Sequence, residues 1–145
     1  MLTQHQEFEL DDERARIDFP RVHGWLTLSY WTPGISAEQV AKAAAGSSLV
    51  VGAYRGEEQI GYLRVISDMA RFAYLCDVWV DEAYRGRGLA TAMVRFAIDH
   101  PDFTTVTQWM LATRDAHDVY RRSGFRPLLE VNPERWMVYI PAKSS

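Results

Sequence analysis

The chain has 145 residues, of which 48% are apolar and 24% charged, and its formal net charge is −3. This length suits one compact domain with its own hydrophobic core, so we expect a single domain over residues 1–145. The content of five Trp, seven Tyr and six Phe argues against a disordered chain. The weak acidity argues against a general nucleic-acid binder, which carries a basic surface.

The cysteine content and the N-terminus bear on where the protein works. Cys76 is the single cysteine, so no internal disulfide can form, which fits a reducing cytoplasm. Residues 1–19 lack the basic start and apolar run of a signal peptide, and no apolar run approaches the roughly 18 residues of a membrane span. We therefore expect a cytoplasmic protein with neither a membrane nor a nucleic acid as its partner. The four histidines lack ligand spacing, so no metal site is predicted.

The N-terminal third of the chain predicts one strand and two helices. Residues 6–10 fit a short strand, and the charged stretch after them fits a loop. Apolar residues then recur at helical spacing over residues 19–31, with Pro20 well placed for a first turn. A second helix is predicted between Ser36, which suits an N-cap, and Gly46, which suits a helix stop.

Three strand-like segments come next, and only short joints separate them. Short joints between adjacent strands are typical of antiparallel hairpins. We therefore expect a three-stranded antiparallel meander, built from residues 48–55, 59–67 and 72–80.

The second half of the chain alternates helices and strands. From Gly88 to His100, apolar residues recur with the period of one helix face. The strand–helix–strand order across residues 72–112 predicts one parallel crossover in an otherwise antiparallel sheet. The fold class is therefore α+β (mixed α/β), with a central mixed, mostly antiparallel sheet of six to seven strands and about four flanking helices. The segments after the crossover helix are a strand at 105–113, a short helix at 115–125 and final strands at 126–131 and 135–140.

The junction between strand 72–80 and the following helix has the composition of an anion-binding loop. The first turn of a helix has unpaired N–H groups and a partial positive charge, and both favour phosphate. Gly86 and Gly88 allow a ligand to approach the backbone, and Arg85 and Arg87 add charge at the rim. The loop lacks the lysine–hydroxyl pair of a Walker loop and the third glycine of a dinucleotide fingerprint. An ordinary strand-to-helix turn with solvated arginines is an equally good interpretation of these four residues alone.

Two segments together resemble one known family. The run Arg85-Gly86-Arg87-Gly88-Leu89-Ala90 matches the [QR]-x-x-G-x-[GA] pattern of the GCN5-related N-acetyltransferases (GNAT). The segment AHDVYRRSGFRP is similar to the A-x-x-x-Y-x-x-x-G-F segment of the same family, and one helix and one strand separate the two. The resemblance implies a GNAT-like fold from residue 5 to about residue 140.

The resemblance also implies a coenzyme A site. In that family the amides of the loop hold the pyrophosphate, and the strand before the loop pairs its backbone with the pantetheine arm. Thr113 stands where many members carry an asparagine that contacts the cofactor, although it can also cap the next helix. The implied cofactor-binding residues are Val78, Val80, Arg85, Gly86, Arg87, Gly88, Leu89, Ala90, Thr91 and Thr113.

Tyr120 matches the tyrosine that lies near the sulfur in the family. Its phenol, with a reference pKa near 10, is protonated at neutral pH and can donate a proton to the departing thiolate. The alternative is a tyrosine in the apolar stripe of a helix, beside Ala116 and Val119.

An amine acceptor arrives as an ammonium ion and must lose a proton before it attacks. Asp77 is the best candidate to attract that cation and help remove the proton. It lies in mid-strand, where burying an unpaired charge costs free energy. The alternative is an ion pair with a neighbouring arginine such as Arg64. Asp68, in the hairpin tip, is a weaker substrate-binding candidate that could be a turn residue.

Three aromatic residues, Trp25, Tyr30 and Trp31, lie around the end of the first helix. In the family this region often forms a wall of the acceptor site, and aromatic rings can stack on a cation. Packing at the helix junction is the alternative for all three.

The resemblance predicts an acetyl-CoA-dependent N-acetyltransferase that moves an acetyl group to a primary amine by direct attack in a ternary complex. The acceptor is a small-molecule amine or a peptide amine, and a homodimer is left open because dimers are common in the family. The alternatives are a transferase that uses another acyl-CoA, and a non-catalytic regulatory module that binds acyl-CoA.

Overall fold

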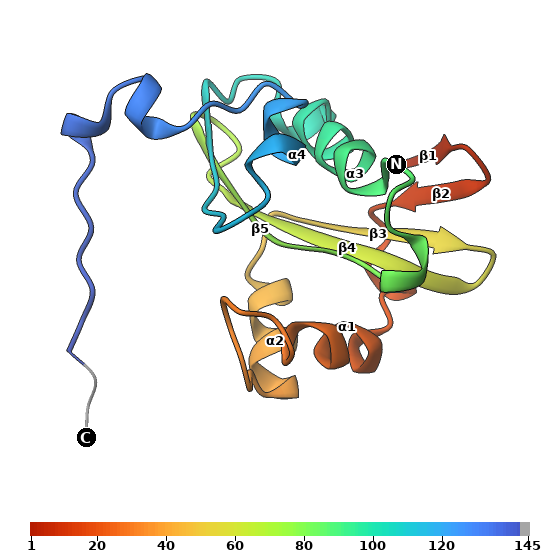
Figure 1. The fold of residues 1–145 in the computed structure, drawn as a ribbon. Helices are drawn as coiled ribbons and strands as arrows, with labels where there is room; N and C mark the ends of the chain where they lie inside the picture. Colours follow the sequence, from red (N-terminus) through yellow and green to blue (C-terminus); the bar gives the residue numbers. More distant parts are fainter. Residues whose placement is uncertain (143–145) are drawn as a thin grey trace.

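The computed structural model describes residues 1–142, and its centre is a six-stranded sheet in which the strands lie in sequence order. All neighbouring strands are antiparallel except β5 and β6, which are parallel. Figure 1 shows the sheet with its two layers of helices. The predicted α+β fold class is therefore confirmed. The strands are β1 (Leu2–His5), β2 (Phe8–Asp11), β3 (Leu49–Arg55), β4 (Glu58–Ser67), β5 (Phe72–Val80) and β6 (Gln108–Met110).

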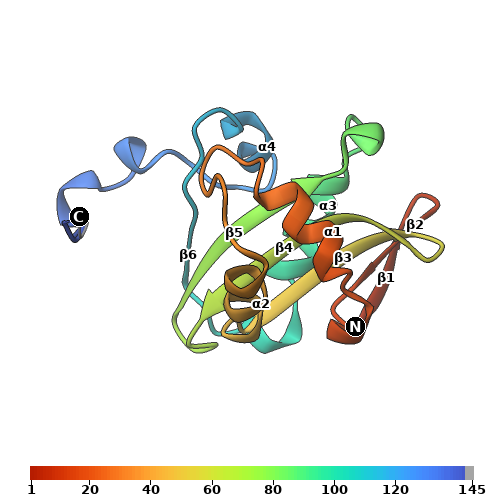
Figure 2. The same cartoon turned by 90° about the horizontal axis from the view of Figure 1, so that it is seen from below.

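The α-helices of the described chain cover both faces of the sheet (Figures 1 and 2). One face packs against α3 and forms the larger hydrophobic core, while the other packs against α1 and α2 and forms the smaller one. The apolar stripe of α3, which includes the fully buried Met93 and Val94, is the reason that this helix lies on the sheet. The helices are α1 (Phe19–Leu26), α2 (Ala37–Ala45), α3 (Leu89–Ile98) and α4 (His117–Arg121).

The capping signals of the first two helices are confirmed. Pro20 lies in the first turn of α1, and the Ser36 side chain accepts a hydrogen bond from the Gln39 backbone N–H at 3.1 Å. Gly46 is the C-cap of α2. The first helix is shorter than predicted, because it ends at Leu26 and the chain continues as turns.

The predicted strand 6–10 is in fact the turn and second strand of a hairpin. Gln6 has a φ of 56° in that turn, and β1 pairs with β2 from Leu2 to His5. The sequence pattern missed β1 because its side chains are largely exposed and carry no apolar alternation.

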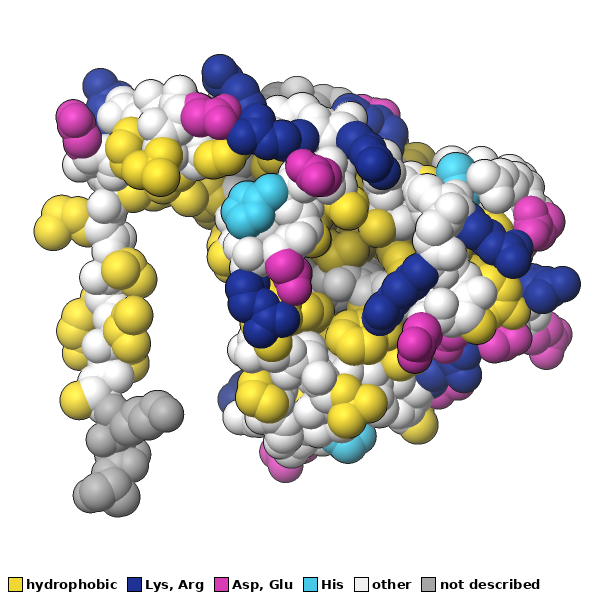
Figure 3. Space-filling view, viewed as in Figure 1, with side chains coloured by type: hydrophobic (Ala, Val, Ile, Leu, Met, Phe, Trp, Pro, Cys, Tyr) yellow, Lys and Arg dark blue, Asp and Glu magenta, His cyan; other side chains and the backbone are white. Residues whose placement is uncertain are grey.

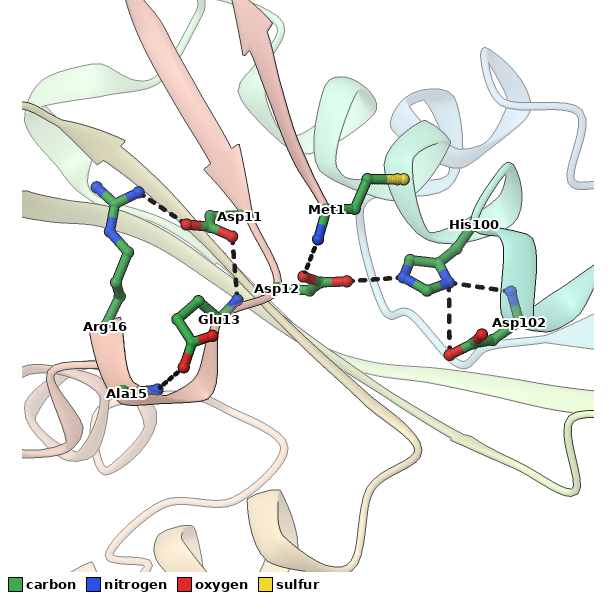
Figure 4. A network of polar contacts seen from close by, with 8 residues as sticks. All are labelled: Met1, Asp11, Asp12, Glu13, Ala15, Arg16, His100 and Asp102. Atoms are coloured by element: carbon green, nitrogen blue, oxygen red, sulfur yellow. Dashed lines mark hydrogen bonds and ion pairs between the residues drawn. The ribbon is translucent and has the colours of Figure 1, made fainter.

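A polar network joins the end of this hairpin to the far end of α3 (Figure 4). Asp12 accepts hydrogen bonds from the Met1 amino group and from His100 Nε2, the latter at 2.7 Å. Burial alone would raise the pKa of the Asp12 carboxyl, but these two hydrogen bonds hold it below its usual value. Beside it, Arg16 pairs with Asp11 at 2.9 Å. The network is structural, because it anchors the hairpin on the α3 side of the sheet.

The two predicted C-terminal strands are wrong. Over residues 126–140 the chain forms two short 3₁₀ turns, at Leu128–Glu130 and Pro133–Arg135, followed by an extended segment that leaves the sheet (Figures 1 and 2). A proline begins each of these turns or directly precedes it, and proline cannot donate to a sheet ladder. The apolar pattern of 135–140 is typical of a strand, yet none of the strands found in residues 1–142 pairs with it. The strand predicted at 105–113 is also shorter, since β6 covers only three residues.

Candidate active site

The loop between β5 and α3 carries a row of free backbone donors. Gly86 and Gly88 have φ values of 82° and 75°, a conformation that L side chains adopt only with strain. Gly88 is the N-cap of α3. Across residues 1–142, no hydrogen-bond acceptor receives the backbone N–H groups of residues 86–91. Unpaired N–H groups at a helix N-terminus are suited to bind a phosphate.

The hairpin of β1 and β2 holds this loop in place. His5 Nε2 and Gln6 Nε2 donate to the Arg87 carbonyl, at 2.9 and 3.3 Å. The carbonyl is thereby occupied, and the N–H groups around it stay available. Sequence reasoning missed both residues, and no local signal could have found them, because they lie about eighty positions away from the loop along the chain.

The side chains of the two loop arginines contact other parts of the protein, so less of their charge is available to a bound anion. Arg85 Nε donates to the Val80 carbonyl at 3.0 Å, and the Arg85 guanidinium lies over the Trp79 ring. Arg87 pairs with Glu7 at 3.2 Å. Both guanidinium groups therefore have protein partners, so the groups of the loop that are free to bind an anion are its backbone N–H groups.

Beside the loop, β5 and β6 separate and leave β5 with an open edge. The two strands pair only from Phe72–Gln108 to Tyr74–Met110. Backbone groups alternate in direction along a strand, and the Asp81 N–H points to β4, where it bonds to the Ile60 carbonyl. The backbone of Val80, and by the same alternation that of Val78, therefore points to the open edge.

A cavity of about 160 Å³ lies where the two strands diverge. Its walls come from β5, from the chain that follows β6, from α4 and from the loop after α1. The cavity brings together six of the predicted site residues: Tyr30, Trp31, Asp77, Val78, Thr113 and Tyr120.

Asp77 is held in the cavity wall by two side chains. Asp77 lies within β5 and has a φ of 56°, next to a shift in the β4–β5 register. One carboxylate oxygen accepts from Arg64 Nε at 2.6 Å and the other from Trp31 Nε1 at 2.8 Å. The ion pair with Arg64, offered above as the alternative role, is therefore present. The Asp77 side chain is 8% exposed, so the pair lies largely away from water.

Tyr120 reaches the cavity from α4 with its ring packed edge-on against Phe125. Burial and the nearby Tyr30 raise the pKa of Tyr120 to about 12. The phenol is therefore a neutral O–H donor at physiological pH. Thr113 supports the start of this helix, because its hydroxyl accepts from the Ala116 N–H at 3.0 Å.

Tyr30 and Trp31 form the outer wall, in edge-to-face contact with each other. The Tyr30 hydroxyl accepts from the Arg114 backbone N–H at 2.7 Å, which ties the loop after α1 to the segment before α4. Cys76 also lines the cavity, and burial raises the pKa of its thiol to about 11, so it is a neutral, structural thiol.

Two predicted substrate-binding residues lie elsewhere. Trp25 packs in the smaller core with Arg21 over its ring, and it does not line the cavity. Asp68 closes the β4–β5 hairpin, where its carboxylate accepts from the N–H groups of three residues, Ala70, Arg71 and Phe72. These hydrogen bonds, led by the one from Arg71, lower the pKa of Asp68 to about 2. Both placements match the structural alternatives.

Comparisons with known proteins test the assignment independently. The family model described as "Acetyltransferase (GNAT) family" matches residues 7–125. The chain belongs to the GNAT family of acetyltransferases. It is therefore an N-acetyltransferase, and acetyl-CoA binding is characteristic of its family.

Solved structures agree with this GNAT assignment. A protein from Xanthomonas campestris pv. campestris assigned to the GNAT family is 34% identical, with a TM-score of 0.85 over 96% of each chain. A GNAT family acetyltransferase from Streptococcus pneumoniae is 21% identical, with a TM-score of 0.71 over 99% of this chain and 100% of that one. Glucosamine-6-phosphate N-acetyltransferase from Arabidopsis thaliana is 14% identical, with a TM-score of 0.63 over 95% and 99%. The last two show the shared fold alone.

No curated protein matched the chain. None of the helices in the described part of the chain has the length and hydropathy of a membrane span.

The GNAT family generally uses acetyl-CoA as its donor, and the residues of this chain fit that molecule. The unpaired N–H groups of residues 86–91 suit a pyrophosphate, and the open edge of β5 suits the amide-bearing pantetheine arm. Both features lie on the same strand–loop–helix unit, with the cavity beside the strand.

Proposed function

We propose that this GNAT enzyme transfers an acetyl group from acetyl-CoA to a primary amine by direct attack while both substrates are bound. The observation that carries the proposal is the shared cavity of Asp77 and Tyr120, beside the strand that leads to a loop of free N–H groups. This arrangement supports a donor held along β5 and an acceptor that enters between α4 and the loop after α1. Catalysis then depends chiefly on bringing the two substrates together.

The donor is held mainly by backbone groups in this proposal. The N–H groups of residues 86–91 bind the pyrophosphate, and the backbones of Val78 and Val80 pair with the pantetheine amides. Of the two loop arginines, Arg87 acts through its main chain, because the Arg85 N–H already donates to the Glu82 carbonyl at 3.5 Å. The guanidinium groups of both are engaged elsewhere. Leu89, which is buried, holds the first turn of α3 on the core.

Tyr120 assists the departure of the sulfur. The amine nitrogen forms a bond to the acetyl carbon, the carbon–sulfur bond breaks, and the sulfur gains a proton while the nitrogen loses one. A thiol has a pKa of about 8.5, whereas that of Tyr120 is raised to about 12, so complete transfer from the phenol alone is unfavourable. Tyr120 therefore donates a hydrogen bond to the developing thiolate, and any proton that it gives up is replaced by the proton that the nitrogen loses after the neutral amine has bonded to the acetyl carbon.

Asp77 orients the amine. A carboxylate has about four lone-pair positions, so Asp77 can accept from an ammonium group in addition to Arg64 and Trp31. The two existing partners fix its direction before substrate binds. We propose that Asp77 positions the amine and passes its proton to water, in keeping with the predicted role.

The size and lining of the cavity favour an acceptor whose amine lies at the end of a narrow group. Tyr30 and Trp31 are each 41% exposed at its mouth, where their rings can contact a cation. A cavity of about 160 Å³ favours acetyl over long acyl groups. The rest of the acceptor, whether a small molecule or a peptide, lies outside this cavity.

A kinetic experiment tests the proposal. Release of free coenzyme A is measured with acetyl-CoA and a panel of primary amines, and both concentrations are then varied for the best amine. Direct attack predicts intersecting double-reciprocal lines and no acetylated enzyme in the absence of amine. Parallel lines with an isolable acetyl-enzyme contradict direct attack, and acetyl-CoA binding without turnover of any amine favours the regulatory module.

A further inference from the structure

Four consecutive residues of the β1–β2 hairpin contact one residue of the loop before α3, Arg87. His5 Nε2 and Gln6 Nε2 both donate to the Arg87 carbonyl oxygen, at 2.9 and 3.3 Å. Glu7 pairs with the guanidinium at 3.2 Å, and the central carbon of the guanidinium lies 5.7 Å from the centroid of the Phe8 ring. Figure 3 shows basic and acidic side chains side by side over this end of the hairpin, at the right of the view. Arg87 is therefore held at both its main chain and its side chain.

The hairpin is fixed at two points that lie on either side of α3 in the sequence. At its turn, the His5 side chain lies against the backbone of Gly88, where an added Cβ would be 3.6 Å from His5 Nε2. At its other end, the Asp12 carboxylate accepts from His100 Nε2 at 2.7 Å, two residues after α3 ends. Between these points Phe8 is fully buried. The turn is therefore a rigid support for the loop.

Gln6 occupies a turn position that favours glycine. Its φ of 56° lies in the left-handed region, and glycine or asparagine is usual there in a two-residue hairpin turn. Burial in the core does not compensate for this strain, because Gln6 is exposed. Its side-chain amide, however, donates to the Arg87 carbonyl. A strained backbone that directs a side chain at a functional loop is typical of a functional constraint.

The hydrogen bonds from His5 and Gln6 set the direction of the Arg87–Gly88 peptide. In a trans peptide the C=O and N–H groups point in opposite directions. Because the carbonyl is held against the hairpin, the Gly88 N–H points away from it, and this N–H has no acceptor within residues 1–142. Rotation of the peptide changes the φ of Gly88, and glycine adopts positive and negative φ about equally. Gly88 therefore does not fix the peptide by itself, and the two side chains supply the constraint.

A rotated peptide would oppose the binding of an anion. The Arg87 carbonyl would then face the position proposed for the pyrophosphate, with its partial negative charge toward the ligand, and the Gly88 N–H would be lost as a hydrogen-bond donor. Neither His5 nor Gln6 lines the cavity of Asp77 and Tyr120, so the effect of both is confined to the loop.

We propose that His5 and Gln6 are positioning residues, which hold the Arg87–Gly88 peptide so that its N–H is directed at the pyrophosphate of acetyl-CoA. This inference rests on the proposed function, in which the loop N–H groups bind that pyrophosphate. It assigns a role to the hairpin turn, which lies about eighty residues before the loop in the sequence.

Calorimetry with two acetyl donors tests the proposal. Acetyl-CoA and S-acetylpantetheine, which lacks the pyrophosphate, are each titrated into the wild type and into the double variant His5→Leu/Gln6→Met. Both substitutions remove the N–H donor and keep a side chain of similar size. The double variant is expected to bind acetyl-CoA about tenfold or more weakly, as the loss of one hydrogen bond to a charged group implies, and S-acetylpantetheine less than about twofold more weakly.

Three further variants serve as controls. Gln4→Met is matched to Gln6→Met, because Gln4 is an exposed glutamine of the same hairpin whose side chain makes no hydrogen bond within the described chain, and it should bind acetyl-CoA as the wild type does. His5→Gln keeps a hydrogen-bond donor and should retain most of the affinity. Gln6→Met alone, at an exposed site, gives the same comparison of donors if circular dichroism shows that the double variant does not fold.

Steady-state kinetics provide a second measurement on the same variants. The double variant should raise the KM for acetyl-CoA, while kcat and the KM for the amine change less than about twofold, because the cavity is not altered. A general loss of structure would instead lower kcat as well.

Three results would overturn the proposal, and they differ in what they leave standing. If the wild type binds both acetyl donors equally, the loop does not hold the pyrophosphate, and the proposed donor site fails together with this inference. If the wild type prefers acetyl-CoA and the double variant keeps the whole preference, the donor site stands but His5 and Gln6 do not position it. If the double variant loses affinity for both donors equally, the hairpin is a general structural support.

Discussion

The two ends of the active site are built on opposite principles. At the loop of residues 86–91 the backbone N–H groups are free, while the side chains of Arg85 and Arg87 are engaged with other parts of the protein. In the cavity we propose that side chains carry the chemistry, and these side chains are fixed by one another, as Asp77 is by Arg64 and Trp31. The loop therefore depends on backbone conformation, and the cavity depends on contacts between distant elements. Substitutions should affect the two ends in different ways.

The largest effect is expected in the cavity. Tyr120→Phe removes the proposed hydrogen bond to the leaving sulfur and should lower kcat by about 100-fold, while the dissociation constant of acetyl-CoA changes little. Steady-state kinetics and calorimetry measure the two quantities. Tyr54→Phe is a matched control, because the buried Tyr54 hydroxyl has no hydrogen-bond partner among residues 1–142 and lies outside the site.

The raised pKa of Tyr120 also predicts how the reaction rate depends on pH. Because Tyr120 keeps its proton until the pH approaches about 12, its ionisation does not limit the rate at lower pH. The rate should rise from pH 6 to pH 9 as the free amine fraction of the acceptor grows. Equal kcat values for wild type and Tyr120→Phe would remove Tyr120 from the mechanism.

The next effect is expected at the loop. Gly86→Ala places a Cβ on the open side of the loop at a φ of 82°, which should weaken acetyl-CoA binding about tenfold or more. Gly56→Ala is the control, because Gly56 also has a positive φ and open space but lies in the β3–β4 turn. Both variants should lose about 1–2 kcal/mol of stability, yet only Gly86→Ala should change the dissociation constant. Equal binding by the two variants would mean that the loop does not contact the donor.

A smaller effect separates the two roles of Asp77. Asp77→Asn and Arg64→Gln both break the ion pair and should each lower the free energy of unfolding by about 2 kcal/mol. Only Asp77→Asn removes an acceptor for the ammonium, so it alone should raise the KM for the amine by about tenfold. If the two variants raise KM equally, Asp77 is a structural residue and its role in positioning the amine is lost.

The smallest effect is expected at Asp68. Its folded-state pKa of about 2 lies below the unfolded value of about 3.9, so its stabilising contribution is present above pH 4 and is lost as the pH falls toward 2. Asp68→Ala should therefore lower the melting temperature at pH 7 and change it less at pH 2.5, with no effect on kcat/KM. A fall in kcat/KM for the amine would instead assign Asp68 to the acceptor site.

The sequence pattern predicted the elements whose structure depends on residues that are close together in the chain. The cap at Ser36, the stop at Gly46 and the short-jointed meander follow from contacts between residues close in sequence. The loop of residues 86–91 belongs to the same class, because glycine conformation and a helix N-terminus specify it. These features were predicted from the sequence for that reason.

Other features arise only from the tertiary structure. His5 and Gln6 donate hydrogen bonds to the loop, and Trp31 donates one to Asp77. Each of these contacts joins residues that are far apart in sequence. The C-terminal segment failed differently: its apolar pattern is that of a strand, but a strand exists only where another strand accepts it. An apolar pattern alone is therefore not enough to predict a strand.

The claim that the loop N–H groups bind phosphate is tested most directly by a comparison of two ligands that differ by one phosphate group. S-acetylpantetheine and S-acetyl-4′-phosphopantetheine are each titrated into the protein in a calorimeter. We predict that the phosphorylated ligand binds about tenfold tighter or more, since a charge-assisted hydrogen bond contributes about 1.5–3 kcal/mol. Equal affinities for the two ligands would contradict the account.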